Sequence, residues 1–199
     1  VNSGNKVYDG EALTVSGFVG ETEKGIPVTA DGKNYYVKGL SANATGINVS
    51  DSTSVNATGT AQVVDEAGND VTSEFKVTVN PGTLTITPRQ VTLKSATLSK
   101  EYDGTALVNG DTPLATEDGW VEGEGANYQF TGSVTLPGAT APNAYTYTAK
   151  EGTDFNNYSI SYNEGQLSIT SKEAKYEVQV TVNSGNKVYD GEALTVSGF

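Results

Sequence analysis

Repetition within the chain constrains its fold more than any other feature. The first eighteen residues, VNSGNKVYDGEALTVSGF, return unchanged at 182–199, an offset of 181 residues. A shorter echo lies between them, because KVYDGEALT at 6–14 resembles KEYDGTALV at 100–108. A second pair, EFKVTVNPGTLTIT at 74–87 and NYSISYNEGQLSIT at 157–170, is offset by 83 residues. Self-similarity at a fixed period is typical of arrays of one structural unit, so the sequence predicts modules of roughly 85–95 residues.

The repeats also predict the domain organisation. We expect a first module at 1–88, whose opening strand is truncated, and a second module at 89–171. Residues 172–199 then form the start of the next repeat, with an opening strand followed by a Tyr-Asp-Gly motif. Links of two or three residues, at 87–89 and 170–173, predict a semi-rigid array arranged end to end.

Hydrophobic periodicity predicts strands throughout the chain. In the second repeated motif, Phe75, Val77 and Val79 alternate with polar residues, which is the pattern of a half-buried strand. Asn80-Pro81-Gly82 and Asn163-Glu164-Gly165 resemble short turns, so each module is expected to end in a hairpin. Residues 90–98 and 175–182 read as opening strands, and a change of phase near residue 96 suggests a bulge. Further strand candidates are 12–19, 26–29, 34–37, 47–50, 58–64, 105–108, 120–122, 128–136 and 144–149.

These strands lead to a fold class. Apolar stripes of helical period with capping signals are absent, and six or seven short strands in about 90 residues are typical of a small sandwich. We therefore predict an all-β chain of tandem immunoglobulin-like antiparallel β-sandwich modules arranged end to end. A small barrel is the alternative for each module.

Composition excludes several classes of function. The net charge of −12 is spread evenly along the chain and argues against a nucleic-acid partner. There is no apolar run near 18 residues, so no membrane insertion is expected in this segment. Cysteine, histidine and methionine are absent, and no nucleophile, phosphate-loop or zinc-protease motif occurs. We expect no enzyme activity and no cofactor.

The Tyr-Asp-Gly motif is interpreted as a structural device. The tyrosine ring is expected to lie at a module boundary, with its hydroxyl bonded to a backbone group, while Asp-Gly makes a turn. The motif residues are Tyr8, Asp9, Gly10, Tyr102, Asp103, Gly104, Tyr189, Asp190 and Gly191. The alternative is a site in which tyrosine stacks on sugar and aspartate holds a cation.

Acidic turns raise the question of calcium, which needs six to eight oxygen ligands. The candidate ligands are Asp65, Glu66, Asn69 and Asp70 in one cluster, and Glu117 and Asp118 with Glu122 and Glu124 in another. EF-hand spacing is absent, so solvated turns are the simpler interpretation. Strand lysines also admit an intramolecular isopeptide bond, with Lys6, Lys76, Lys94 and Lys100 as candidates. The single tryptophan, Trp120, is expected to be buried.

The chain resembles a known group of bacterial repeats. YDGxAL, GWVEGEGANYQFTGSVTLPGA at 119–139, EAGNDVTSEFKVTVNPGTLTIT at 66–87 and NYSISYNEGQLSIT at 157–170 together resemble the YDG and MBG-type immunoglobulin-like repeats of Gram-positive (Firmicutes) cell-surface proteins and adhesins. That resemblance implies a stalk that projects a distal functional domain from the cell, in an extracellular, cell-wall-anchored or secreted protein. Its partners would be neighbouring repeats of the same protein.

Two further partners follow from the sequence. Residues 21–56 depart from the compact repeat pattern, so the first module is the expected binder if this chain recognises a host glycan or protein, through aromatics such as Tyr35 or Tyr36. Because residue 182 corresponds to residue 1, the strand at 174–183 has no module of its own within the sequence. We expect it to dock on the first module of another copy, head to tail.

Overall fold

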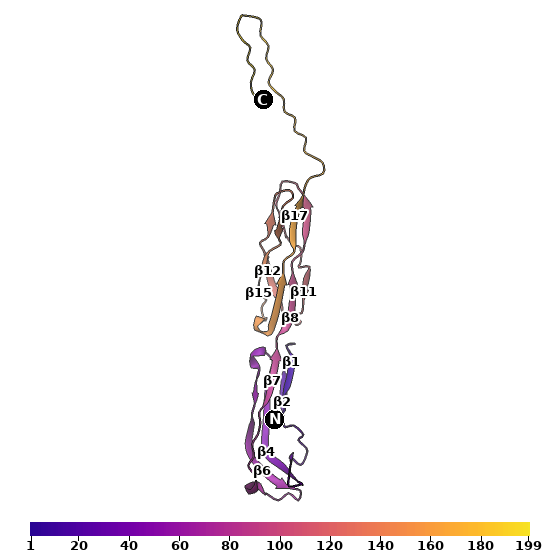
Figure 1. Ribbon diagram of the computed structural model, residues 1–199, viewed down its shortest axis with the longest axis vertical. Coiled ribbons are helices and arrows are strands. Elements are labelled where there is room, and N and C mark those ends of the chain that lie inside the picture. The colour runs from indigo at the N-terminus through magenta and orange to yellow at the C-terminus, as the bar shows by residue number, and fades with distance from the viewer.

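Strands make up nearly all of the regular structure, so the expectation of an all-β chain is confirmed. The computed structural model describes residues 1–199 as a long, narrow molecule, with two β halves stacked along its long axis and a final segment projecting from one end (Figure 1). Three short 3-10 turns are its only helical segments, and no helix in the structure is long and apolar enough to span a membrane.

The N-terminal half, residues 1–87, contains two sheets. One has the strand order β1-β7-β5, and in the other β4 pairs with β2, β3 and β6. The elements are β1 (Gly4–Val7), β2 (Leu13–Ser16), β3 (Ile26–Ala30), β4 (Lys33–Gly46), η1 (Val49–Asp51), β5 (Thr53–Val55), β6 (Ala57–Asp65), η2 (Thr72–Glu74) and β7 (Gly82–Thr87).

The C-terminal half, residues 89–170, divides into shorter sheets. Their orders are β11-β8-β16, β14-β17-β9, β12-β15 and β10-β13. The elements are β8 (Arg89–Lys94), β9 (Leu98–Glu101), β10 (Leu107–Val108), β11 (Thr116–Asp118), β12 (Ala126–Phe130), β13 (Ser133–Val134), β14 (Thr140–Pro142), β15 (Tyr145–Ala149), η3 (Phe155–Asn157), β16 (Tyr158–Asn163) and β17 (Gln166–Thr170).

The same pairings recur in the two halves. Strand β1 runs parallel to β7 as β9 runs parallel to β17, and β5 lies antiparallel to β7 as β14 lies antiparallel to β17. The β2–β4 ladder corresponds to β10–β13, and the β4–β6 ladder to β12–β15. Three pairings have no counterpart. In the C-terminal half β8 runs parallel to β16 and antiparallel to β11, whereas the equivalent residues 75–80 of the N-terminal half form no ladder. In the N-terminal half β3 lies antiparallel to β4.

The sheets are mixed, so the expected purely antiparallel arrangement is wrong. Three ladders are parallel, namely β1–β7, β8–β16 and β9–β17. The expected C-terminal hairpins are wrong for the same reason. Strands β16 and β17 do not pair with each other, and they follow β8 and β9 in one direction on either side of a short break.

The glycines in these breaks explain why the sequence suggested turns. Neither Gly82 nor Gly165 has a positive φ, as a tight turn would require. Instead, a Cβ at Gly82 would overlap the carbonyl oxygen of Asn2, and one at Gly165 would overlap that of Ala96. Glycine is needed here because the backbone of the parallel partner strand approaches closely.

Three local expectations also differ from the structure. Residues 47–50 enter the turn η1 instead of a strand, because the Asp51 carboxylate accepts hydrogen bonds from the amides of Ile47 and Asn48 at 2.8 Å. Residues 120–122 form no strand and lie between two glycines of positive φ. The break between β8 and β9 is not a bulge, because both strands of the ladder are interrupted equally and the pairings Arg89–Tyr158 and Leu98–Leu167 share one offset.

The main core runs through both halves. Its buried residues are Tyr8, Val15, Phe18, Ala42, Val55, Leu84 and Ile86 from the N-terminal half, with Val91, Leu93, Tyr145 and Tyr158 from the C-terminal half. A smaller cluster of Val134, Leu167 and Ile169 fills the far end of the C-terminal half.

The terminal segment, residues 171–199, pairs with neither half and is exposed almost throughout. It nevertheless repeats local contacts of its N-terminal copy. The Asn183 side-chain amide donates to the Ser197 carbonyl at 3.1 Å, as that of Asn2 donates to the Ser16 carbonyl at 2.8 Å. The conformation of the eighteen-residue repeat is therefore largely local.

Candidate functional site at the junction of the two halves

The chain passes between the halves through a single residue. Strand β7 ends at Thr87 and β8 begins at Arg89, which leaves Pro88 alone between them. Proline fixes φ, and the Arg89 guanidinium donates through Nε to the Gly119 carbonyl at 2.6 Å. The covalent link is thus short and stiff, and the hydrogen bond from Arg89 to Gly119 fixes the start of β8 beside it.

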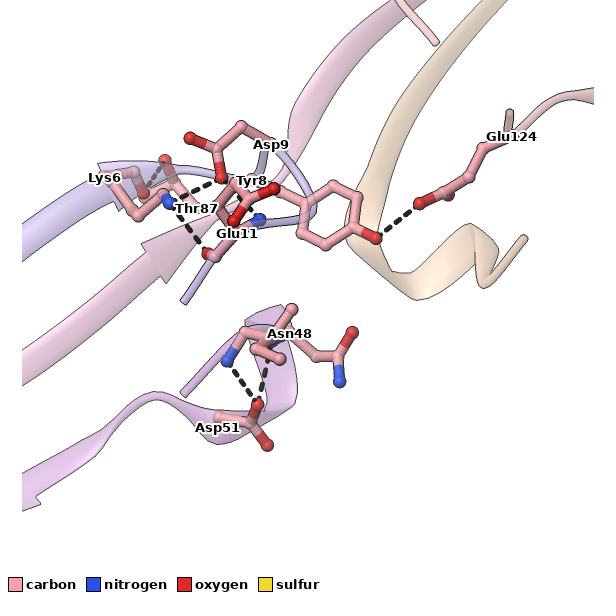
Figure 2. A network of polar contacts seen from close by, with 9 residues as sticks. Lys6, Tyr8, Asp9, Glu11, Asn48, Asp51, Thr87 and Glu124 are labelled. Atoms are coloured by element: carbon pink, nitrogen blue, oxygen red, sulfur yellow. Dashed lines mark hydrogen bonds and ion pairs between the residues drawn. The ribbon is translucent and has the colours of Figure 1, made fainter. Parts of the chain in front are cut away.

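Glu124 joins two tyrosines from opposite halves. The Tyr8 hydroxyl donates to Glu124 Oε1 at 2.6 Å (Figure 2), and the Tyr158 hydroxyl donates to Glu124 Oε2 at 2.7 Å. The two rings meet edge to face, with centroids 5.4 Å apart. Hydrogen bonds to an ionised acceptor are stronger than neutral ones, and the partly buried setting limits competition from water. The carboxylate therefore ties the two halves together.

The two tyrosines stay protonated over a wide pH range. Burial, followed by the hydrogen bond to the Glu124 carboxylate, raises the pKa of Tyr8 to about 12. The same two causes also raise the pKa of Tyr158. Because both phenols keep their protons, both remain donors to Glu124 well above neutral pH.

Asp9 and Gly10 hold Tyr8 in place. The Asp9 carboxylate accepts a hydrogen bond from the Glu11 amide at 2.9 Å and forms an ion pair with Lys6, which lies nearby in Figure 2. Gly10 takes a φ of +80° and packs against Val121. A side chain at Gly10 would be strained by that φ and crowded by Val121, so the turn fits only a glycine.

A pair of asparagines closes the other side of the junction. Asn157, which is 1% exposed, accepts a hydrogen bond from the Val49 amide at 2.9 Å through Oδ1. Its Nδ2 donates to Asn48 Oδ1 at 2.8 Å. Asn157 thus satisfies a backbone amide at the end of the N-terminal half.

The three Tyr-Asp-Gly motifs share one turn but lie in three environments. Each aspartate pairs with a lysine three residues earlier, and Gly10, Gly104 and Gly191 all have φ near +80°. Tyr8 is buried at the junction, Tyr102 is half-buried, and Tyr189 is 93% exposed in the terminal segment. Asp103 and Asp190 each accept a hydrogen bond from the amide two residues later, as Asp9 does. The expected backbone partner for the tyrosine hydroxyl is wrong for Tyr8, which bonds to a carboxylate.

The calcium candidates do not gather into a site. No group of three acidic side chains lies close enough together to hold a metal ion. Asp65 accepts from Asn69, Asp70 accepts from Thr72 and Gln62, and Glu66 accepts from Asn34. Glu117 accepts from the Tyr128 hydroxyl at 2.7 Å, and Asp118 is exposed in β11. Asp65 and Asp70 are thus bonded within their own turn, whereas Glu66 and Glu117 accept from side chains of the neighbouring strands β4 and β12.

The other residues that the sequence suggested, namely the strand lysines, Trp120, Tyr35 and Tyr36, lie in strands, in aromatic packing or on the surface. Lys6 in β1 and Lys100 in β9 bond through their side chains to the Tyr-Asp-Gly turns, and Lys76 and Lys94 are exposed. Trp120 is half-buried and packs against Phe155 and Tyr158. Tyr35 meets Phe75 edge to face, and Lys24 lies over the Tyr36 ring.

Sequence reasoning missed the partners of Tyr8. The sequence groups Glu124 with an acidic cluster and gives no reason to select Asn157, although Asn157 precedes Tyr158 in the second repeated motif. The repeated motif could have located Asn157, because a residue directly before a repeated strand lies at the same end of each half. Nothing in the sequence reveals that the facing end carries Asn48.

Comparison with protein-family models, curated proteins and solved structures gave no match. What the junction can do follows from its own chemistry. It offers a carboxylate, two phenols and two amides that are bonded to one another across the boundary between the halves. Such an arrangement holds two β units at a fixed angle.

Proposed function

We propose that this chain is a stalk segment of a large bacterial cell-surface protein, anchored in the cell wall or secreted. Tandem immunoglobulin-like β-sandwich modules would project a distal domain away from the cell. The resemblance to YDG and MBG-type repeats supports the setting, and the junction supports the mechanical role.

The continuous core is the observation that carries this proposal. One buried cluster contains Tyr8 and Ile86 together with Val91 and Tyr158, so the two halves share apolar packing. A one-residue link and a shared carboxylate add to that packing. A stalk needs such joints, because a hinge at each boundary would let it collapse.

The Tyr-Asp-Gly repeats extend the same joint along an array. Tyr102 lies at the end of the C-terminal half from which the terminal segment departs, and its amide donates to the Thr170 carbonyl at 3.0 Å. The Tyr8 amide donates to the Thr87 carbonyl at 2.9 Å in the same way. We infer that Tyr102 contacts the next repeat as Tyr8 contacts the C-terminal half.

Backbone relaxation by NMR tests the rigidity of the joint. We expect the amides of both halves to report one anisotropic rotational diffusion tensor, with the long axis along the stack. Replacing Tyr8 and Asn157 together by alanine should separate the halves into two faster-tumbling bodies. Tyr102→Ala is the matched control and should leave the common tensor unchanged. Independent tumbling of the halves in the unmodified chain would refute the stalk proposal.

Surface exposure is tested separately. Brief protease treatment of intact cells of the source organism should release peptides of this chain before any cytoplasmic marker. Release only after lysis would contradict the proposed location.

A further inference from the structure

An apolar groove lies along one side of the N-terminal half. It has a volume of about 590 Å³, and twelve of its seventeen lining residues are hydrophobic. Residues 75–81 form one wall, and Val28, Thr29 and Ala30 of β3 form another. Val37 and Val63 contribute to the lining from β4 and β6.

The wall at 75–80 is a strand sequence without a strand partner. Phe75, Val77 and Val79 are half-buried while the residues between them are exposed, which is the alternation of a strand with one apolar face. No ladder forms here, and β3 also has a free edge because it pairs only with β4. Unpaired backbone groups beside an apolar groove are a template for an added strand.

The C-terminal half shows what occupies this place. Residues 158–163 correspond to 75–80, and in that half β8 lies parallel beside them with Val91 and Leu93 fully buried. The end of the ladder is equivalent as well. The Ser95 amide donates to the Asn163 carbonyl at 3.1 Å, and the Val1 amino group donates to the Asn80 carbonyl at 3.0 Å. The groove is therefore shaped for a strand like β8.

The chain contains one further strand of that kind. Alignment of the Tyr-Asp-Gly motifs places 176–181 at the position of β8, so that Val178 corresponds to Val91 and Val180 to Leu93. In the structure this strand is unpaired, with Val178 80% exposed and Val180 65% exposed. It carries the apolar face that the groove lacks.

We propose that residues 176–181 of one copy of this chain dock as a parallel strand in the groove of a second copy, beside residues 75–80. The register of β8 on β16 fixes the pairs. Tyr176 lies opposite Phe75, Val178 opposite Val77, and Val180 opposite Val79. This pairing goes beyond the stalk role and does not depend on it.

Charge supports the same register. The pairing that corresponds to Gln90 with Ser159 places Glu177 opposite Lys76 on the exposed face. The next exposed pair, Gln179 with Thr78, is neutral. Opposite charges on facing residues favour pairing, and a shift by one residue would turn the valines of the donor toward water.

The strand cannot reach the groove of its own chain. It follows β17 after residues 171–175, and these five residues span at most roughly 18 Å when fully extended. Residues 158–170 run along the C-terminal half over about 43 Å at 3.3 Å per residue, and the groove lies beyond them in the other half (Figure 1). Docking of 176–181 in this groove therefore joins two copies, which makes the contact head to tail and open-ended.

The pairing stops at residue 181. From Val182 onward the donor repeats the residues that already form β1 and β2 of the acceptor. If those identical residues change places, the pairing of 176–181 is unaffected. Hydrogen exchange should show new protection at 75–80 and 176–181 as the protein concentration rises.

Sedimentation equilibrium of the full chain tests the proposal. We expect the mass to rise from 20.7 kDa in steps of one chain as concentration increases. Val180→Asp should weaken association by roughly a hundredfold or more, because it places a charge in the groove. Gln179→Asp is the matched control, adds the same charge to the exposed face and should leave association within about fivefold. Both positions lie in a segment that forms no ladder, so neither change affects folding of the halves.

A charge exchange tests the register itself. Lys76→Glu and Glu177→Lys should each weaken association by about fivefold, and the two together should restore it. A chain that stays monomeric at all concentrations overturns the proposal, as does a Val180→Asp variant that associates like the unmodified chain. Failure of the double variant to recover overturns the register. The relaxation experiment on monomeric Val180→Asp still reports on the joint, so failure of one proposal is distinguishable from failure of the other.

Discussion

Residues 75–80 and 158–163 occupy equivalent places in the two halves, yet only the second segment forms a ladder. The unpaired segment, FKVTVN, alternates apolar and polar residues as regularly as the paired one. The paired segment, YSISYN, lies beside β8. Whether a segment forms a ladder therefore depends on the presence of a neighbouring strand more than on its own β propensity.

The ends of the two halves differ in a similar way. Tyr8 meets Glu124 and Tyr158 across the junction, whereas Tyr102 occupies the same place in its half with no facing module. The repeated motif thus provides pairs of equivalent positions, in which one residue contacts the other half and its counterpart does not. Substitution at both members of a pair separates what the motif contributes by itself from what the neighbour adds.

The largest effects are expected where the halves do not differ. Leu84 and Leu167 are the equivalent fully buried residues of β7 and β17. We expect Leu84→Ala and Leu167→Ala each to lower the free energy of unfolding by about 2–5 kcal/mol, because each leaves a cavity on a central strand. Denaturant titration followed by circular dichroism measures both. A cost below about 1 kcal/mol for either would break the equivalence of the two strands.

The asparagine at the junction should show the next largest difference. Asn157 corresponds to Glu74 in the second repeated motif, and only Asn157 contacts the other half. Asn157→Ala leaves the half-buried amide of Val49 without its protein partner and should cost about 1–3 kcal/mol. Glu74→Ala at the exposed position should stay within about 0.5 kcal/mol. Equal costs at the two positions would show that Asn157 acts within its own half.

These pairs show how far the sequence could predict the fold. Period-two alternation identified most strands, including those near β2, β3, β6 and β15. The repeats identified which residues are equivalent, which local sequence alone cannot do. Parallel pairing escaped prediction because glycine that allows a backbone to approach looks the same in sequence as glycine that makes a turn. Gly82 and Gly165 illustrate this.

The candidate site was predicted in part. Motif repetition singled out Tyr8, Asp9 and Gly10, since a turn of local hydrogen bonds depends only on nearby residues. Glu124 and Asn157 are brought to Tyr8 and Val49 from more than a hundred residues away. Such contacts depend on how the halves stack, and no local pattern encodes that arrangement.

Removing single hydroxyls sharpens the comparison of the tyrosines. Tyr8→Phe deletes one of two donors to Glu124 and should cost about 1–2 kcal/mol. Tyr102→Phe should cost less than about 0.5 kcal/mol, since its hydroxyl has no hydrogen-bond partner in the structure. Denaturant titration of both variants gives the difference. A similar cost for Tyr102→Phe would indicate that the motif uses its hydroxyl within one half.

Alkaline pH should weaken the junction. The pKa of Tyr8 is raised to about 12 in the folded chain, above the ordinary value of about 10 for an unfolded tyrosine. The contribution of protonated Tyr8 to the free energy of unfolding is therefore fully present below pH 10 and is lost as the pH rises through 12. We expect the free energy of unfolding to fall across that range, and to fall less steeply in Tyr8→Phe. Absorbance at 295 nm follows the titration, and identical profiles for the two proteins would argue against a role for Tyr8.

The smallest effect concerns the turn aspartates, and it asks how much of the motif is local. Hydrogen bonds from Lys100 and Thr105 lower the pKa of Asp103, and those from Lys187 and Glu192 lower the pKa of Asp190. Asp103 lies in a folded half and Asp190 in the exposed terminal segment. Both pair with the lysine three residues earlier and accept from the amide two residues later, so the turn has the same contacts without a surrounding half. The contribution of Asp103 to stability is present above its unfolded pKa near 4 and is lost as pH falls through its folded value. NMR titration of the carboxyl carbons should place both aspartates below the ordinary range. An ordinary pKa for Asp190 beside a lowered one for Asp103 would show that the turn needs its module. In that case the terminal segment would take up this conformation only after its opening strand has found a partner.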